Sequence, residues 1–201
     1  MTLDRAGWPF VAGLGAFTLG LYAVAPLLAA VGAVLLVFTL NFFRDPRRRP
    51  PGDPGALLSP ADGRIIRADA ERVSIFMNVF DVHVCRSPVS GRVTSVAHEP
   101  GRFLAAMKDE ASEHNERTAI VVQTPEGNPV RFALVAGLVA RRIVCRVAAG
   151  RVLAAGERVG IIRFGSRVDI DLPTGTRLAV VVGDRVVAGE TVVARRVARP
   201  G

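Results

Sequence analysis

The feature that most constrains this chain is an uncharged apolar run near its N-terminus, residues 10–38. An apolar stretch longer than about 18 residues is typical of a segment that enters a membrane. A secretory signal peptide would have a shorter apolar core behind a basic leading segment, and neither is present. The run is long for one span and short for two, and Pro26 divides it. A kinked helix and a shallow helical hairpin are therefore both open.

A basic segment follows the apolar run, with Arg44, Arg47, Arg48 and Arg49 close together. The positive-inside rule predicts that what comes next lies on the cytoplasmic side of the cell membrane. Each arginine near an anionic surface would also contribute about 1 kcal/mol of attraction to lipid head groups. Residues 50–55, rich in Pro and Gly, have the composition of a stiff linker. We therefore predict a membrane-associated segment over residues 1–49 and a separate domain over residues 50–201.

The second part has the pattern of a β domain. Short Val- and Ile-rich runs alternate with Gly, Pro and Asp turns from Leu57 onward, which predicts an all-β sandwich or barrel. Helix is favoured only around residues 102–112. Two turn-then-strand units repeat: residues 59–65 resemble 87–93, and residues 155–160 resemble 182–187. These echoes predict a folded-over sheet with pseudo-twofold character, similar to the barrel-sandwich of biotinyl- and lipoyl-like domains.

Charge and cysteine content exclude some functions. The net charge of +8 comes almost entirely from arginine, without the interleaved aromatic residues of a nucleic-acid surface. We therefore predict no nucleic-acid partner. Cys85 and Cys145 lack metal-ligand spacing and fit a reducing compartment, so neither a zinc site nor a disulfide framework is expected.

Three residues form a candidate catalytic set. Ser166 follows Gly165 inside a strand-like run, where a glycine usually marks a bulge or bend. A serine hydroxyl there can attack the carbonyl of the preceding peptide bond, given a strained backbone and a base. His83, on an alternating strand, is the candidate base, and Asp62, in a turn, is the candidate orienting carboxylate. Taken singly, each residue is better explained as ordinary structure; His98 and His114, in looser polar stretches, are weaker bases.

Several separated motifs occur in an order that resembles one family. They are Phe-Arg-Asp-Pro at residues 43–46, Ser-Pro-Ala-Asp-Gly at 59–63, Asp-Val-His-Val at 81–84, Pro-Gly-Arg-Phe at 100–103 and Phe-Gly-Ser at 164–166. Together they resemble the phosphatidylserine decarboxylase proenzymes in their short bacterial and archaeal branch. The longer branch carries a second histidine before the strand histidine, and Phe80 stands at that position here.

The resemblance implies a self-processing enzyme. It implies cleavage between Gly165 and Ser166 into a β chain (1–165) and an α chain (166–201), which stay together as a heterodimer, with a higher homo-oligomer left open. Asp62 would orient His83, and His83 would take the Ser166 hydroxyl proton. Ser166 would become a pyruvoyl group that forms a Schiff base with the substrate amine.

The implied reaction converts phosphatidylserine to phosphatidylethanolamine and CO2 in phospholipid biosynthesis, at a membrane and without a metal. Arg86 and Arg117 are candidates for binding the head-group phosphate, from their charge and placement.

Two other functions compete with this one. A membrane-tethered, lipoyl-like β module could bind partners without catalysis, although its usual modification site is a lysine at a hairpin tip. The one lysine, Lys108, lies in the helix-like stretch instead. A nucleic-acid-binding β barrel is favoured by the net charge alone.

Overall fold

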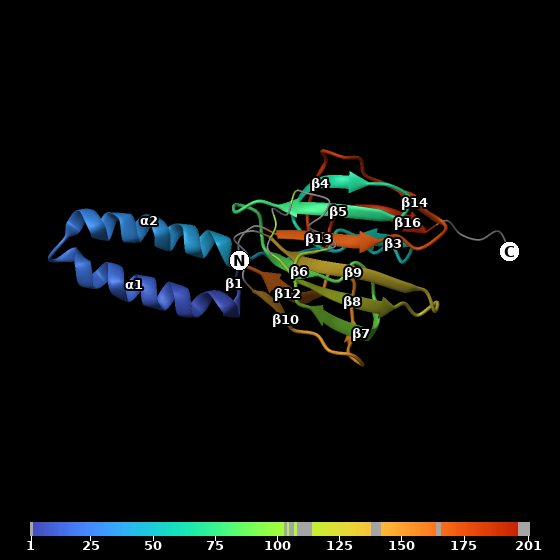
Figure 1. The fold of residues 1–201 in the computed structure, drawn as a ribbon, viewed down its shortest axis with the longest axis horizontal. Helices are drawn as coiled ribbons and strands as arrows, with labels where there is room; N and C mark the ends of the chain where they lie inside the picture. The colour runs from blue at the N-terminus through green and yellow to red at the C-terminus, as the bar shows by residue number, and fades with distance from the viewer. Residues whose placement is uncertain are drawn as a thin grey trace. The chain divides into compact units, whose positions relative to one another are not determined.

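The computed structural model describes residues 2–102, 104, 107, 114–137, 142–163 and 166–196 (Figure 1). It divides into two compact units, Met1–Arg47 and Arg48–Gly201. The sequence places this boundary two residues later, after residue 49. The described chain is mainly β, as predicted, with its helices confined to the first unit.

The first unit is a helical hairpin. Helix α1 spans Trp8–Tyr22 and α2 spans Pro26–Phe42, after a short 3-10 turn at Arg5–Gly7. Pro26 begins α2 because a proline in the first turn gives up no hydrogen bond that the helix needs. The hairpin is therefore the correct alternative, and a single kinked helix is wrong. No helix in the described part of the chain has both the length and the apolar character to cross a membrane.

The two ends of the hairpin are fastened together. Strand β1 (Thr2–Leu3) pairs antiparallel with β2 (Arg44–Asp45), and the Asp4 carboxylate caps the 3-10 turn at Ala6 N, 2.9 Å away. Within the hairpin many apolar side chains face outward, among them Leu19 at 77% and Leu27 at 79% exposure. Such a surface is unusual for a unit that meets only water.

The second unit is built from antiparallel strands. They are β3 Ala56–Leu58, β4 Gly63–Ala68, β5 Arg72–Met77, β6 Val84–Arg86, β7 Gly91–Glu99, β8 Arg117–Gln123, β9 Pro129–Ala136, β10 Ile143–Cys145, β11 Val152–Leu153, β12 Arg158–Ile162, β13 Ser166–Asp171, β14 Thr176–Leu178, β15 Arg185–Val186 and β16 Val192–Arg196. Most of the helix expected at residues 102–112 lies outside the described residues.

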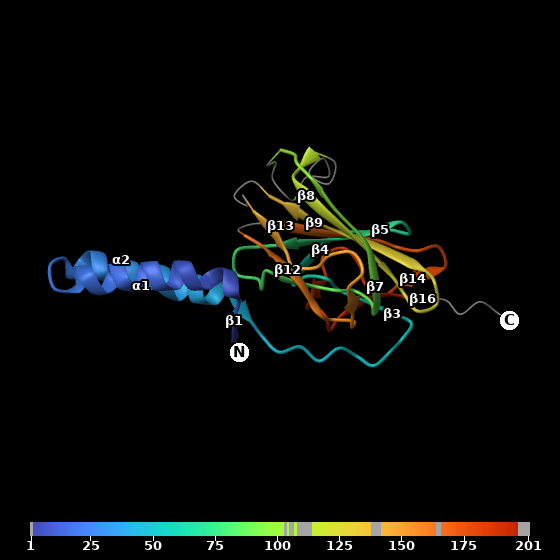
Figure 2. The same cartoon turned by 90° about the horizontal axis from the view of Figure 1, so that it is seen from below.

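The strands form one large curved sheet and two small ones (Figures 1 and 2). The large sheet has the order β11-β7-β8-β9-β13-β5-β4-β15, and the small sheets have the orders β10-β12-β6 and β14-β16-β3. Their inner faces share one apolar core, with Ile75, Phe132 and Val168 among its buried members. Alternating side chains along each strand supply this core, which is the period-two pattern read from the sequence.

The strand order is internally symmetric. The large sheet reads the same from both ends when β11 is exchanged with β15, β7 with β4, β8 with β5 and β9 with β13, and the small sheets exchange with each other. The repeated turns coincide under this exchange: Ser59 Oγ donates to Ala61 O at 2.6 Å, and Ser87 Oγ donates to Val89 O at 2.7 Å. The echo of residues 59–65 in residues 87–93 therefore marks two structurally equivalent halves. The second predicted echo is wrong in its register: Gly156 N donates to Ser87 O and Gly189 N donates to Ser59 O, each at 2.8 Å, so residues 155–160 correspond to 188–193 and not to 182–187.

One half is inserted into the other. Strands β6 to β12 follow one another in the chain, whereas their equivalents are split into β3–β5 and β13–β16. The chain leaves the split half after Met77, through residues 78–83, and returns to it through residues 163–165, just before Ser166. We call these two connecting segments, residues 78–83 and 163–165, the crossings. The first carries His83, and the second leads to the Gly165–Ser166 bond. Gly165 lies outside the described residues.

Candidate active site

Ser166 is the first residue of β13 and is held on both sides. It pairs with Met77 at the end of β5 and with Ala136 at the end of β9. Its side chain is fully buried, and its hydroxyl lies 3.3 Å from the Met77 sulfur, a weak acceptor. The candidate nucleophile therefore has a fixed, largely apolar setting from which water is excluded.

His83 lies on the crossing from β5 to β6 and is also fully buried. Its Nδ1 lies 2.9 Å from the carbonyl oxygen of Asp81. Because a carbonyl oxygen can only accept, this contact assigns the proton of the neutral ring to Nδ1. The lone pair, and with it the capacity to take a proton, then belongs to Nε2.

Backbone contacts bring both crossings to one end of the unit. The N–H of Ile162, the last residue of β12, lies 3.4 Å from the carbonyl oxygen of His83. Ser166 begins β13 shortly after Ile162, and its partner Met77 ends β5 shortly before His83. The candidate nucleophile and the candidate base thus lie at the same end of the β unit, on segments far apart in the sequence.

Asp62 lies in the turn before β4, and its carboxylate has two partners. Arg48 Nη2 donates to Oδ2 at 2.7 Å and to Oδ1 at 2.9 Å, and the N–H of Ala188 donates to Oδ1 at 2.7 Å. Burial raises the pKa of the Asp62 carboxyl, while the hydrogen bond from Ala188 and the Arg48 charge act in the opposite direction. The contact that orients His83 here is the Asp81 carbonyl, so the orienting role of Asp62 stays a prediction.

Comparison with known proteins identifies the family. The family model for phosphatidylserine decarboxylase matches residues 35–194. A phosphatidylserine decarboxylase proenzyme of Burkholderia ambifaria strain MC40-6 is 49% identical over 96% of this chain and 95% of its own length. One from Burkholderia multivorans is 48% identical over the same shares. The chain belongs to the phosphatidylserine decarboxylase family.

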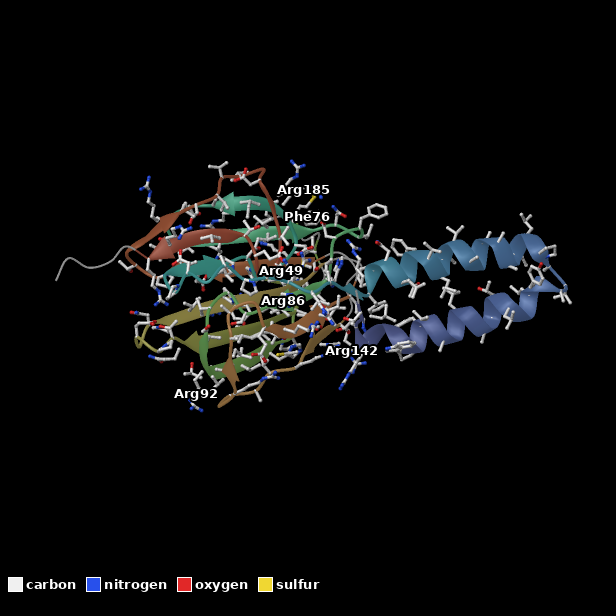
Figure 3. All side chains as sticks on the ribbon, turned by 180° about the vertical axis from the view of Figure 1, so that it is seen from behind. Arg49, Phe76, Arg86, Arg92, Arg142 and Arg185 are labelled. Carbon is white, nitrogen blue, oxygen red and sulfur yellow. The ribbon has the colours of Figure 1, made fainter. Side chains whose placement is uncertain are left out.

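The two arginines predicted to bind phosphate make other contacts in this family member. Arg86 is buried within the β unit, and its Nη1 donates to the carbonyl oxygen of Gly156 at 3.0 Å (Figure 3). Arg117, on β8, forms an ion pair with Glu99 on β7, with Nε and Oε2 2.8 Å apart. Both guanidinium groups thus make contacts that hold parts of the β unit together. Their role in phosphate binding stays a prediction.

The sequence alone did not single out three groups that contact the candidate catalytic residues, namely Met77, the Asp81 carbonyl and Arg48. Met77 contacts Ser166 because of its place in the sheet, and Asp81 contacts His83 through its backbone carbonyl. Neither contact can be predicted from the residue type. Arg48 was read as part of a basic flank, whereas its neighbour on the structure is Asp62. The run of arginines was the available signal, but nothing in it distinguished Arg48 from Arg47 or Arg49.

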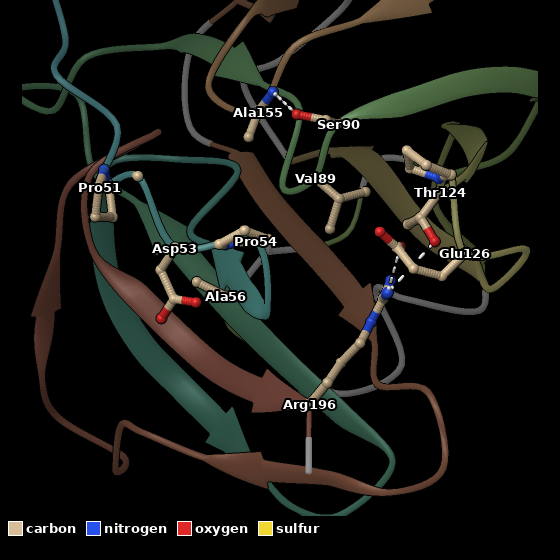
Figure 4. A pocket seen from close by; sticks show the side chains of 12 residues that line it. Pro51, Asp53, Pro54, Ala56, Val89, Ser90, Thr124, Glu126, Ala155 and Arg196 are labelled. Carbon is tan, nitrogen blue, oxygen red and sulfur yellow. Dashed lines mark hydrogen bonds and ion pairs between the residues drawn. The ribbon is translucent and has the colours of Figure 1, made fainter. Parts of the chain in front are cut away.

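A cavity of about 290 Å³ lies elsewhere in the β unit of this decarboxylase (Figure 4). Its lining includes Pro51, Ser90, Glu126 and Arg196, and none of Ser166, His83 and Asp62. The charges at its wall pair among themselves, since Arg196 Nη1 lies 3.0 Å from Glu126 Oε2. This cavity is therefore separate from the candidate catalytic residues.

Proposed function

We propose that this chain is a self-processing phosphatidylserine decarboxylase that releases CO2 from phosphatidylserine to give phosphatidylethanolamine. The observation that carries the proposal is the family match over nearly the whole chain, and the Gly165–Ser166 pair resembles the family's cleavage site. The site supports it, because a buried serine and a buried histidine lie at the same end of the β unit. No comparison favours the non-catalytic adaptor module.

The proposed first step is cleavage of the chain by its own serine. Ser166 Oγ attacks the Gly165 carbonyl carbon, its proton passes to His83, and the C–N bond breaks to leave an ester and a free amine. Elimination then releases the Gly165 carboxylate and leaves a dehydroalanine at residue 166. Tautomerisation and hydrolysis by one water release ammonia and leave a pyruvoyl group. The sum is one water consumed and one ammonia released.

His83 is suited to be the base of this step. With Nδ1 donating to Asp81 O at 2.9 Å, the ring presents Nε2 as its proton acceptor. Burial keeps bulk water from supplying competing protons or from hydrolysing the ester early. The same imidazole, once protonated, is a proton donor for the later decarboxylation.

The residues around Ser166 fit a pyruvoyl group at this position. A small group with a carbonyl would replace a side chain that already lies in a dry setting against Met77. When present, a pyruvoyl group supplies an electron sink for the charge left by CO2 loss, which no unmodified side chain supplies well. The chain's own part is to hold residue 166 by pairing with Met77 and Ala136.

The two fragments are expected to stay together after cleavage. The α chain, residues 166–201, contributes β13, which lies between β9 and β5 of the β chain. It also contributes β16, paired with β3, and β15, paired with β4. These ladders do not involve the Gly165–Ser166 bond, so its loss leaves them intact, and we propose a heterodimer of the two chains.

The first unit is proposed to hold the enzyme at the cell membrane. Its exposed apolar side chains suit the acyl region of a bilayer, and the exposed arginines of the flank that follows, which do not include Arg48, suit anionic head groups on the cytoplasmic side. A lipid substrate is consistent with such an anchor. We further propose that the β unit is of the barrel-sandwich type, on the support of its twofold strand order.

The test is decarboxylation of the lipid itself. Purified full-length protein is mixed with vesicles that contain phosphatidylserine labelled at the serine carboxyl carbon, and released CO2 is counted. We expect release by the wild-type protein and none by Ser166→Ala, which differs by one oxygen. Equal release from both proteins, or none from a cleaved wild-type protein, would overturn the proposal.

A further inference from the structure

Arg48 and Asp62 form a nearly buried ion pair. Their side chains are 10% and 14% exposed, and Nη2 of Arg48 contacts both carboxylate oxygens of Asp62. Nη1 of Arg48 also lies 3.9 Å from Glu190 Oε2. Two charges withdrawn from water in this way are costly to separate, since removing one leaves the other without compensation.

The other half of the β unit shows what this turn needs for folding. Ser90 is the twofold equivalent of Asp62, and its Oγ accepts a hydrogen bond from Ala155 N at 2.9 Å (Figure 4). Asp62 accepts the corresponding bond from Ala188 N at 2.7 Å. In the described residues the Ser90 hydroxyl has no guanidinium partner. A single hydroxyl is thus enough to accept the hydrogen bond at this turn. The fold itself does not require the carboxylate of Asp62 or its arginine partner.

The extra charge lies close to the segment that holds His83. The turn that carries Asp62 lies against β6, the strand that follows His83, because Arg86 N donates to Pro60 O at 2.8 Å. Burial is the largest cause of the raised pKa of Asp62, and the carboxylate of Asp81, whose carbonyl oxygen contacts His83, makes a smaller contribution. Asp62 in turn helps to raise the pKa of the Cys85 thiol, although burial of that thiol is the larger cause. An ionised Asp62 therefore adds negative potential around this crossing.

We propose that Arg48 is a positioning residue of the self-processing site, holding the Asp62 carboxylate in place beside the crossing that carries His83. The inference rests on the proposed self-processing. When His83 takes the Ser166 proton it becomes positively charged, and a fixed carboxylate nearby stabilises that charge. Arg48 acts through Asp62 and does not contact the reacting atoms.

The inference predicts a change in pH dependence. The charged and titratable groups that act on Asp62 or are affected by it are Arg48, Asp81 and Cys85, and Glu190 lies 3.9 Å from Arg48. Burial already raises the pKa of Asp62, and loss of Arg48 removes a charge that lowers it. More of Asp62 is then protonated at a given pH, so the acid limb of the processing rate moves to higher pH. The defect shrinks as the pH rises and the carboxyl ionises again.

The experiment follows self-cleavage of the full chain, made by cell-free translation in detergent and shifted to buffers from mildly acidic to mildly alkaline. Conversion to the smaller fragment is timed on gels for Arg48→Gln, Arg48→Lys and Arg49→Gln. We expect Arg48→Gln to cleave about tenfold or more slowly at neutral pH, and Arg48→Lys to recover part of the rate. Arg49→Gln, which removes the same charge from an exposed neighbour, should cleave within about twofold of wild type.

A second variant separates positioning from folding. Asp62→Ser copies the twofold equivalent and keeps an acceptor for Ala188 N while removing the carboxylate. If Arg48 acts through Asp62, adding Arg48→Gln to Asp62→Ser causes no further slowing. A double variant that cleaves more slowly than Asp62→Ser alone would overturn the inference. So would an Arg48→Gln protein with the wild-type cleavage rate and pH profile. Failure of the wild-type chain to cleave at all would instead refute the proposed function.

Discussion

Ser166 and Met77 face each other where β13 begins and β5 ends, with the serine hydroxyl 3.3 Å from the methionine sulfur. The inserted half of the β unit lies in the chain between these two residues. In the inserted half the equivalent strands, β8 and β9, are joined directly by a hairpin turn at residues 124–128. Ser166, the residue after the proposed cleavage site, thus begins β13 at the position where the inserted half has this turn.

Met77 should matter for shape rather than for its sulfur. Met77→Leu nearly conserves volume, so we expect less than about 1.5 kcal/mol of destabilisation and processing close to the wild-type rate. Met77→Ala leaves a cavity under Ser166 and should cost about 2–5 kcal/mol and slow processing strongly. Urea unfolding in a Ser166→Ala background measures the first quantity, and gel-timed cleavage measures the second. A Leu variant as defective as the Ala variant would assign a chemical role to the sulfur.

The residue after the cleavage site forms a buried ion pair. Arg167 Nε lies 2.6 Å from Asp169 Oδ1, its Nη2 donates to Ser74 Oγ at 2.8 Å, and the two charged side chains are 0% and 7% exposed. Arg167→Gln removes this charged partner from the buried Asp169 carboxylate and should cost about 3–5 kcal/mol. Urea unfolding in the Ser166→Ala background checks this value.

The matched control is the Arg72–Asp171 pair, which joins β5 to β13 and is 29% and 33% exposed with a similar 2.8 Å contact. Arg72→Gln should cost less than about 1 kcal/mol because water screens the pair. Similar losses for Arg167→Gln and Arg72→Gln would mean that burial does not set the value of the Arg167 pair.

Gly63, directly after Asp62, is required by the backbone. Its φ is +151°, and a Cβ there would lie 2.1 Å from the Phe76 carbonyl oxygen. Gly63→Ala should cost more than about 3 kcal/mol and reduce cleavage, since both strain and collision apply. Gly175 has φ +82° with open space around it, so Gly175→Ala should cost only about 1 kcal/mol. Equal unfolding free energies for these two variants would refute the collision.

His83→Ala should leave the chain uncleaved, because the general base is gone. General-base loss typically lowers a rate by about 10² to 10⁴-fold. His98→Ala is the control, since His98 lies on β7 with Nδ1 3.2 Å from Thr118 Oγ1 and outside the candidate site. Gels of both variants, taken at matched times, give the comparison. Normal cleavage of His83→Ala would reassign the base while leaving the family unchanged.

Local patterns were sufficient to predict the elements. The apolar run divided by Pro26 predicted helix but left a kinked helix and a hairpin open, and alternating Val and Ile residues predicted the strands. The repeated Ser-Pro turns predicted two equivalent halves, because the same turn residues impose the same local hydrogen bonds. Ser166, His83 and Asp62 were selected through motif order and chemistry.

Pairings between distant residues were beyond the sequence pattern. Nothing local to Arg48 shows that its partner is Asp62 and not a lipid head group, since both are anionic. The burial of Arg86 and the Arg117–Glu99 pair likewise depend on strand neighbours that a single sequence does not specify. The Asp81 carbonyl could not be anticipated, because every residue carries one.

The intact mass of the purified protein tests the central claim most directly. The account predicts two fragments that separate on denaturation, the smaller comprising residues 166–201 with a mass of about 4 kDa by residue count and an N-terminus blocked to Edman sequencing. Ser166→Ala prepared alongside should remain a single chain. A wild-type protein of full-length mass, with an ordinary serine between residues 165 and 167 and activity on phosphatidylserine, would contradict it.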